Sequence, residues 1–493
     1  MPHVLALDAG TTGVASLLFD ERGRVVAHAD RDFEQRYPRP GWVEHDPELI
    51  WATAQRVMRA ALKGGPKPAA LGITNQRETV VAWDGKTGRP LAPAIVWQDR
   101  RTAPMVEAVR EAGHEAFVRE RTGLVLDAYF SATKMRWLLE HVPRLERHVK
   151  AGTLRFGTID TWLIHLLTNG EVFATDATNA CRTQLFDIHN LAWDAELGEV
   201  FGVPLDTLPE VRPSSGDFGF VAAGLPGAGL PIRGVAGDQQ AALFGQACYA
   251  PGEAKTTYGT GAFLLMNTGT APVASDRLVT SVAWSLPGRT EYCLEGSIFT
   301  TGAAVQWLRD VGLVAAPAES EALARAVRDT GGVTFVPALA GLGAPHWDPH
   351  ARGAFLGLTR GTTRAHLARA VLESTAFSVK DVLDAMQEAS GHVLPRLRVD
   401  GGGSMNKWLM QFQADTLGVP VERPVVSETT ALGAAYLAGL ASGVWKDTAE
   451  IAARWKRGAA FSPRGRPELA DALARWARAL PRAAAWDESA DPL

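Results

Sequence analysis

The segment Leu7–Gly13 (LDAGTTG) combines one carboxylate with small residues and two hydroxyls. The apolar runs at 4–7 and 14–19 flank it, and their composition predicts a strand, a tight turn and a second strand. Backbone amides and threonine hydroxyls in such a turn can bind phosphate, and the carboxylate can bind a metal ion that the phosphate also holds. An ordinary Asp-Gly turn is the alternative, since both residues are common in turns.

Two further glycine-rich turns follow predicted strands. Residues 255–266 (KTTYGTGAFLLM) repeat the order of strand, Gly/Thr turn and strand. Residues 399–406 (VDGGGSMN) end a strand at 397–399 and precede a helix predicted over 407–417. Glycines at the third turn would let a flat ligand lie against the backbone. Each turn alone could be coincidental or only crowded, but three such turns in order, each following a strand, are much less likely to arise by chance.

The elements that must position these turns alternate between strands and helices. A Gly/Pro-rich loop at 222–231 interrupts the alternation, and a strand at 231–236 and a helix at 238–246 follow it. We therefore expect an α/β protein with two domains, residues 1–248 and 249–493. The other predicted elements are strands at 4–7, 14–19, 25–27, 70–73, 80–83 and 95–97 and helices at 47–62, 367–386 and within 463–486.

The bulk composition restricts the class of protein. The 493 residues suggest two or three domains, on a prior of ~100 to 200 residues per domain. The formal net charge of -4 gives no electrostatic reason to expect nucleic acid or an anionic membrane as partner. Three widely spaced cysteines, Cys181, Cys248 and Cys293, fit neither a disulfide framework nor a zinc cluster. Because there is no leader-like start and no run of ~18 apolar residues, we expect a cytoplasmic protein without a membrane span.

On these turns and on longer stretches, the chain resembles the FGGY carbohydrate kinases, a family within the actin and hexokinase ATPase superfamily. Residues 129–141 (YFSATKMRWLLEH) and residues 353–358 running on to 366–373 match the signatures of the family. The stretches at 40–47, 72–79, 237–246 and 341–345 are typical of the branch that phosphorylates glycerol. The resemblance runs from about residue 4 to about residue 460.

The resemblance implies two actin-like (ribonuclease H-like) domains around a central cleft for ATP and substrate. It also implies glycerol and ATP as the bound molecules, Mg²⁺ as the metal, and a homo-oligomer, either a dimer or a tetramer. The rival readings are an FGGY kinase for another small polyol or sugar and a noncatalytic actin-like nucleotide-binding protein.

Five side chains form the candidate pocket for the polyol. Arg77 and Glu78 follow an apolar strand and offer a donor and an acceptor to neighbouring hydroxyls, although a surface ion pair is the alternative. By the resemblance they bind two hydroxyls of glycerol. Trp97, Tyr129 and Phe263 would supply apolar walls, with core packing as the alternative for any one of them.

Asp238 is the candidate catalytic base. It follows a predicted strand and precedes a helix, which places it where open α/β sheets bind ligands, although a helix N-cap is the alternative. Because phosphoryl transfer has a loose transition state, a solvated carboxylate of pKa ~4 would suffice to accept the hydroxyl proton. Gln239 would add an amide contact, and Asp8 would bind the metal ion together with Asp238.

The remaining candidates contact the nucleotide. The two phosphate loops would bind the phosphates through backbone amides and hydroxyls, and the resemblance adds contacts to the adenine nucleotide. One turn separates Gly302 from Gln306, which puts both on one face of a helix. The full set is Thr11, Thr12, Gly13, Thr260, Gly302, Gln306, Gly402 and Asn406.

Ala15 is a departure from the family pattern. Many members of the glycerol-specific branch follow Gly-Thr-Thr with Ser-Ser-Arg, and that arginine reaches the nucleotide phosphates, whereas this chain has Gly13-Val14-Ala15. We predict that an Ala15→Arg variant binds the nucleotide more tightly, because it restores one cationic contact to the phosphates. The Michaelis constant for ATP checks this, and an unchanged or higher value in the variant would contradict it.

Overall fold

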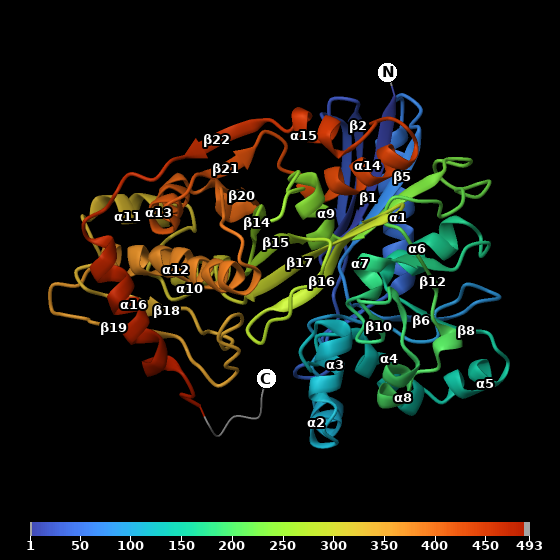
Figure 1. Cartoon of the computed structure of the whole chain (residues 1–493), viewed down its shortest axis with the longest axis horizontal. Helices are drawn as coiled ribbons and strands as arrows, with labels where there is room; N and C mark the ends of the chain where they lie inside the picture. The colour runs from blue at the N-terminus through green and yellow to red at the C-terminus, as the bar shows by residue number, and fades with distance from the viewer. Residues whose placement is uncertain (1, 488–493) are drawn as a thin grey trace.

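The structure, a computed structural model, describes residues 2–487 and is built on two β-sheets with helices packed around them (Figure 1). The first sheet has the strand order β13-β5-β1-β2-β3, in which β1, β2 and β3 are antiparallel and β1, β5 and β13 are parallel. Its strands are β1 (His3–Ala9), β2 (Gly13–Asp20), β3 (Val25–Asp32), β5 (Ala70–Asn75) and β13 (Ile232–Gly237).

The second sheet repeats this pattern and extends it. Its order is β16-β17-β15-β14-β20-β21-β22, and the inner run β17-β15-β14-β20-β21 has the same sequence of antiparallel and parallel pairs as β3-β2-β1-β5-β13. Both predicted phosphate loops therefore occupy the same position, the first hairpin of their sheet. The strands are β14 (Ala254–Tyr258), β15 (Ala262–Gly269), β16 (Val279–Leu286), β17 (Arg289–Ile298), β20 (Leu397–Asp400), β21 (Val421–Pro424) and β22 (Arg457–Phe461).

Strand β1 is apolar on both faces because helices cover both. Leu5 and Leu7 pack toward α1 (Pro47–Leu62), while Val4 and Ala6 pack toward α9 (Asp238–Gly245) and α14 (Thr429–Ala441). Helix α1 has the predicted bounds, because Asp46 accepts a hydrogen bond from the Glu48 amide and proline follows at the first helical position. Asp8 continues the Val4 and Ala6 side, so its side chain lies on the face that α14 covers.

The second sheet packs against the long helix α12 (Arg364–Ser390), α13 (Lys407–Leu417) and α16 (Leu469–Ala483), which lie together at the left of Figure 1. Its opposite face joins the cluster that contains α9 and α14. The remaining helices are α2 (Ala103–Glu111), α3 (Glu115–Thr122), α4 (Ser131–His141), α5 (Arg144–Lys150), α6 (Ile159–Leu167), α7 (Ala177–Ala180), α8 (Ala195–Phe201), α10 (Gly302–Asp310), α11 (Glu319–Ala326) and α15 (Thr448–Arg454).

Short strands and 3₁₀ turns complete the chain. They are β4 (Glu44–His45), β6 (Val81–Asp84), β7 (Ala94–Ile95), β8 (Leu154–Gly157), β9 (Ala174–Asp176), β10 (Phe186–Asp187), β11 (Ala192–Trp193), β12 (Glu210–Arg212), β18 (Thr334–Val336), β19 (Ala354–Leu356), η1 (Leu205–Thr207) and η2 (Gly402–Met405). The strand predicted at 95–97 ends at Ile95, so Trp97 lies beyond it. Within residues 2–487, no helix is long and apolar enough to cross a membrane.

Helix α14 joins the two halves of the chain. It comes late in the sequence, beyond the proposed division at residue 248, yet it packs on β1, β5 and β13 of the first sheet and on α9. Glycines allow this approach: a Cβ on Gly433 would lie 1.8 Å from the Ala241 carbonyl oxygen, and one on Gly245 would lie 2.0 Å from that of Thr429. Backbone therefore packs on backbone between α9 and α14.

We predict that Gly433→Ala destabilises the fold. In an isolated helix the alanine would gain about 1 kcal/mol over glycine, but here its Cβ forces α9 and α14 apart, and overpacking of this kind costs about 1–3 kcal/mol or more. Urea or thermal unfolding checks the sign. Gly361→Ala is the matched control, because the nearest atom to its added Cβ is 3.8 Å away; equal stability of the two variants would contradict the prediction.

Candidate active site

The first phosphate loop, between β1 and β2, is held by neighbours on several sides. The Gln76 side-chain amide donates to the Gly10 carbonyl at 3.1 Å, and the Trp97 indole donates to the Thr11 hydroxyl at 2.9 Å. Thr12 stays exposed. A Cβ on Gly13 would lie 2.8 Å from the Arg31 carbonyl oxygen, so this position excludes side chains. The loop thus has a fixed shape and directly contacts an aromatic residue of the candidate polyol pocket.

Asp8 stands at the end of β1 beside two other carboxylates. Burial and, after it, the negative charges of Asp238 and Glu428 raise the pKa of Asp8 to about 7. Glu428 lies at the start of α14 and was not among the sequence candidates. Like charges gathered in this way favour a divalent cation among them.

The carboxylates at this place fit Mg²⁺ rather than a metal ion that is bound by protein ligands alone. Among residues 2–487, no group of three or more His, Cys, Asp and Glu side chains could hold a metal ion by itself. Mg²⁺ takes one or two carboxylates and completes its shell with phosphate oxygens and water. Asp8 and Asp238 suit that role.

The second phosphate loop packs against the start of α10. The Thr301 and Ala303 amides donate to the Thr260 carbonyl at 3.0 and 2.9 Å, which leaves the Thr260 side chain exposed. A Cβ on Gly302 would lie 2.4 Å from the Gly259 carbonyl oxygen, so glycine is required for this contact. Gln306 is exposed one turn along the same helix. The structure therefore brings Gly302 against the second phosphate loop, with Gln306 one helical turn further along α10.

The third turn has the open surface that a flat ligand needs. Gly401 has a φ of 78°, and Gly401 and Gly403 both pack on Tyr258 of β14. Among the described residues no atom lies within 4 Å of a Cβ built on Gly402. The Asn406 side-chain oxygen caps α13 by accepting from the Leu409 amide at 2.9 Å. The Asn406 amide nitrogen, rather than its oxygen, is thus the atom that can serve a nucleotide.

Three aromatic rings of the candidate polyol site come from both halves of the chain and contact one another. The Trp97 ring lies 5.5 Å from the Tyr129 ring and 6.4 Å from the Phe263 ring, and both pairs are edge-to-face. Phe263 comes from β15 of the second sheet, whereas Trp97 and Tyr129 come from the first half. All three rings are half-buried. The three rings therefore meet between the halves and are not part of either core.

Arg77 and Glu78 lie at the base of this pocket and are 3% and 1% exposed. The alternative of a surface ion pair is therefore wrong. The two outer nitrogens of Arg77 donate to Glu295 at 2.6 and 2.9 Å, and Arg77 Nε lies 3.4 Å from Asp238 Oδ1. Glu78 has a φ of 61°, an uncommon left-handed backbone, and the Ser131 hydroxyl holds its carbonyl at 2.9 Å.

Asp238 is the first residue of α9, directly after β13. Its Oδ1 accepts from the Gln239 amide at 2.7 Å, and the side chain is 29% exposed. Burial raises the pKa of Asp238, and the cations of Arg77 and Lys255 offset this only in part. The expectation of a solvated carboxylate with an ordinary pKa was wrong, because the cleft removes water from it. A raised pKa makes Asp238 a more basic proton acceptor.

Besides Glu428, sequence reasoning missed three charged residues of the site: Lys255, Arg182 and Glu295. The ammonium group of Lys255 donates to the Gln239 side-chain oxygen and to the Thr257 hydroxyl. Burial lowers the pKa of Lys255, although Asp400 and Asp238 act against this. A charged residue within a strand, as at Lys255 in β14 and Glu295 in β17, is the sequence signal that could have found two of them.

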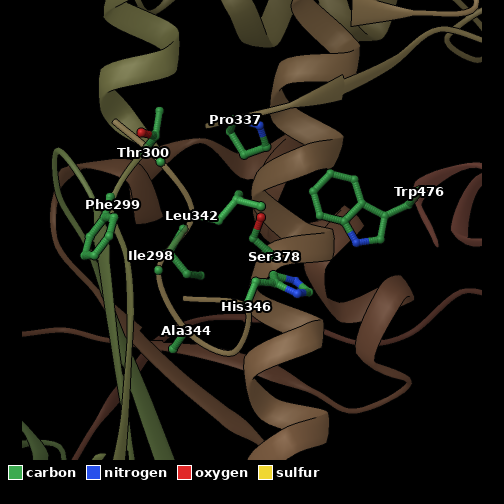
Figure 2. Close-up of a pocket in the computed structure, with 11 residues that line it drawn as sticks. Ile298, Phe299, Thr300, Pro337, Leu342, Ala344, His346, Ser378 and Trp476 are labelled. Carbon is green, nitrogen blue, oxygen red and sulfur yellow. The ribbon is translucent and has the colours of Figure 1, made fainter. Parts of the chain in front are cut away.

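A separate small cavity lies outside this site (Figure 2). It lies between Ile298–Thr300, the loop at 337–346, α12 and α16, and its volume is about 20 Å³. That is room for about one water molecule. Among the described residues, none of the sequence candidates lines it.

Comparison with known proteins identifies the family of the chain. The models of the N-terminal and C-terminal domains of the FGGY family of carbohydrate kinases match residues 3–245 and 254–442. The chain therefore belongs to the FGGY family, and the predicted α/β fold is confirmed. Glycerol kinase 2 of Thermotoga maritima is 54% identical over 99% of this chain and 100% of its own length. The glycerol kinase of Thermus brockianus is 57% identical over 99% of each chain.

A solved structure extends the agreement to three dimensions. The crystal structure of Plasmodium falciparum glycerol kinase with ADP superposes with a TM-score of 0.93 at 37% identity and covers 98% of each chain. The xylulose kinase from Rhodospirillum rubrum superposes with a TM-score of 0.85 at 27% identity.

We predict that Lys255→Met lowers kcat. The variant keeps a long, unbranched side chain but removes the group that donates to Gln239. It also removes the positive charge that, after Arg77, lowers the pKa of Asp238 most. Loss of a charged hydrogen bond of this kind costs about 1.5–3 kcal/mol, so a decrease of roughly tenfold or more is expected. ADP release in a polyol-dependent assay measures it. Thr257→Val, which removes only the other acceptor, is the control; an unchanged kcat in folded Lys255→Met would contradict the prediction.

Proposed function

We propose that the chain transfers the γ-phosphoryl group of ATP to a terminal hydroxyl of glycerol and forms sn-glycerol 3-phosphate. The observation that carries the proposal is the position of Asp238, which lies 3.4 Å from Arg77 and is close enough to Asp8, beside the first phosphate loop, to raise the pKa of Asp8. Full-length relatives of 54–57% identity named glycerol kinase support the choice of glycerol.

The polyol pocket matches a short chain with a hydroxyl on every carbon. The rings of Trp97, Tyr129 and Phe263 would hold the carbon backbone of glycerol. Arg77 would donate to one hydroxyl and Glu78 would accept from another. The third hydroxyl of glycerol, at a terminal carbon, would then point toward Asp238. Phosphoryl transfer requires this placement, because the proton acceptor must reach the hydroxyl that reacts.

Asp238 accepts the proton of the reacting hydroxyl as its oxygen attacks the γ-phosphorus. Because the transition state is loose, catalysis depends mainly on positioning and on stabilising charge. Thr11, Thr12, Gly13 and Thr260 would hold the phosphates from both sides of the cleft. Enclosure between two halves would exclude water and so favour transfer to the polyol over hydrolysis.

Asp8 and Asp238 would hold Mg²⁺ next to these phosphates. When bound, the ion neutralises the negative charge of the phosphate oxygens. The nucleotide would lie along Gly302, Gln306, Gly402 and Asn406, with its base on the open surface at Gly402.

The proposal extends to the form of the protein in the cell. A cytoplasmic location is supported by Cys181, Cys248 and Cys293, which are buried and unpaired in the described structure. A homo-oligomer, dimer or tetramer, is supported by the exposed Val25 and Val26 on the edge strand β3. An FGGY kinase for another small polyol or sugar is the second candidate, since solved xylulose kinases share the fold.

We predict that Asp238→Asn abolishes most glycerol phosphorylation. The amide cannot accept the proton, and loss of a general base typically lowers the rate by about 100-fold or more. Turnover of a small polyol panel, followed as ADP release, measures it. Asp217→Asn is the control, because that carboxylate is 68% exposed and pairs only with Arg233 among the ion pairs of the described residues. No turnover of glycerol by the wild type, or full activity of Asp238→Asn, would refute the proposal.

A further inference from the structure

Four charged side chains are buried together at the base of the polyol pocket. Arg77 and Glu78 follow β5, Arg182 follows α7, and Glu295 lies in β17 of the second sheet. Each is no more than 3% exposed. We call Arg77, Glu78, Arg182 and Glu295 the buried quartet. Arg77 and Glu78 are the two that would contact the proposed substrate, and Arg182 and Glu295 bind these two side chains.

Glu295 of the buried quartet, together with Gln240 and Tyr129, engages both outer nitrogens of Arg77. One outer nitrogen donates to Glu295 at 2.6 Å and to Gln240 at 3.2 Å. The other donates to Glu295 at 2.9 Å and to the Tyr129 hydroxyl at 3.5 Å. Among the described residues, no acceptor makes a hydrogen bond with Arg77 Nε. A single N–H group of Arg77 is therefore left for a substrate.

Glu78 is restricted in the same way. Its Oε1 accepts from Arg182 Nε at 2.6 Å. Arg182 is itself fixed, since it donates to the Ser281 hydroxyl at 2.7 Å and to Glu295 at 3.4 Å. Within residues 2–487, no donor makes a hydrogen bond with Glu78 Oε2. One oxygen of Glu78 is left for a substrate.

The charges of the buried quartet balance, and this keeps the arrangement fixed. Burial acts to raise the pKa of Glu295, but Arg182 and Arg77 outweigh it and lower the pKa to about 2, so Glu295 remains ionised. Removing one member of a buried ion pair leaves an uncompensated charge, which is strongly unfavourable. Arg77 and Glu78 therefore cannot turn to other partners while Arg182 and Glu295 are in place.

We propose that Arg182 and Glu295 are positioning residues that set the polyol specificity of the pocket. By occupying the other atoms of Arg77 and Glu78, they leave one donor and one acceptor side by side. This pair selects a substrate with two adjacent hydroxyls next to the one that reacts. The inference rests on the proposed function, because it assigns Arg77 and Glu78 to the substrate.

Glu295→Gln tests the inference most directly. It keeps the shape of the side chain but removes the charge that holds Arg77, so Arg77 can turn toward Asp238. We expect the KM for glycerol to rise about tenfold or more, with the KM for ATP nearly unchanged. The preference for glycerol over 1,3-propanediol should fall by a similar factor, because that diol lacks the middle hydroxyl and makes only one of the two contacts.

Glu373→Gln is the matched control for the loss of a buried ion pair. Glu373 accepts from Arg369 Nε at 2.8 Å within α12, and both side chains are less than 9% exposed. This variant should lower the unfolding temperature without changing either KM. Equal increases in both KM values for Glu295→Gln, or an unchanged preference between glycerol and 1,3-propanediol, would overturn the inference.

Ser281→Ala keeps the test decisive if Glu295→Gln does not fold. It removes one neutral hydrogen-bond partner of Arg182. We expect a smaller rise in the KM for glycerol and a smaller fall in the preference for glycerol over 1,3-propanediol than in Glu295→Gln. Unchanged values of both would overturn the inference. Wild-type turnover separates this outcome from the proposed function. If the wild type phosphorylates another polyol and not glycerol, the proposed function fails, and the same variants are judged by the KM for that polyol.

Discussion

The active site depends on the burial of Arg77, because a guanidinium group stays ionised away from water, and that is strongly unfavourable unless carboxylates surround it. Glu295 supplies the main partner, and it comes from the second sheet, in β17. The β17 part of the second sheet must therefore reach the first half of the chain. The aromatic pocket follows from the same contact, since Phe263 in the adjacent strand β15 is brought to Trp97.

The rest of the architecture brings two similar sheets to this contact. Both sheets place a Gly/Thr turn at the same point of the same strand pattern, which supports the proposal that the two turns bind one nucleotide. Helix α14 fixes their relation, because it packs on the first sheet although the chain enters it from the second. Glycines at 245 and 433 make that packing close enough to bring Glu428 near Asp8.

Much of the fold was predictable because it depends on local patterns. The helix at 47–62, the strand pairs around both turns and the helix at 407–417 have the predicted positions, since caps, periodicity and glycines act over a few residues. The pKa of Asp238 was not predictable, because the water it loses is displaced by residues from distant parts of the chain. The sequence also could not predict which atom of the Asn406 side chain is left for a ligand. That depends on the hydrogen bond by which its oxygen caps α13.

The sequence by itself determined which residues could do chemistry: the carboxylates, the phosphate turns, the Arg-Glu pair and the aromatic residues, because residue types and their neighbours carry that information. Only the tertiary structure decided how these groups are held. The roles of Lys255, Arg182 and Glu295 depend on hydrogen-bond partners that are separated from them in the sequence. Burial makes charged groups depend on one another, and burial is a property of the folded chain as a whole.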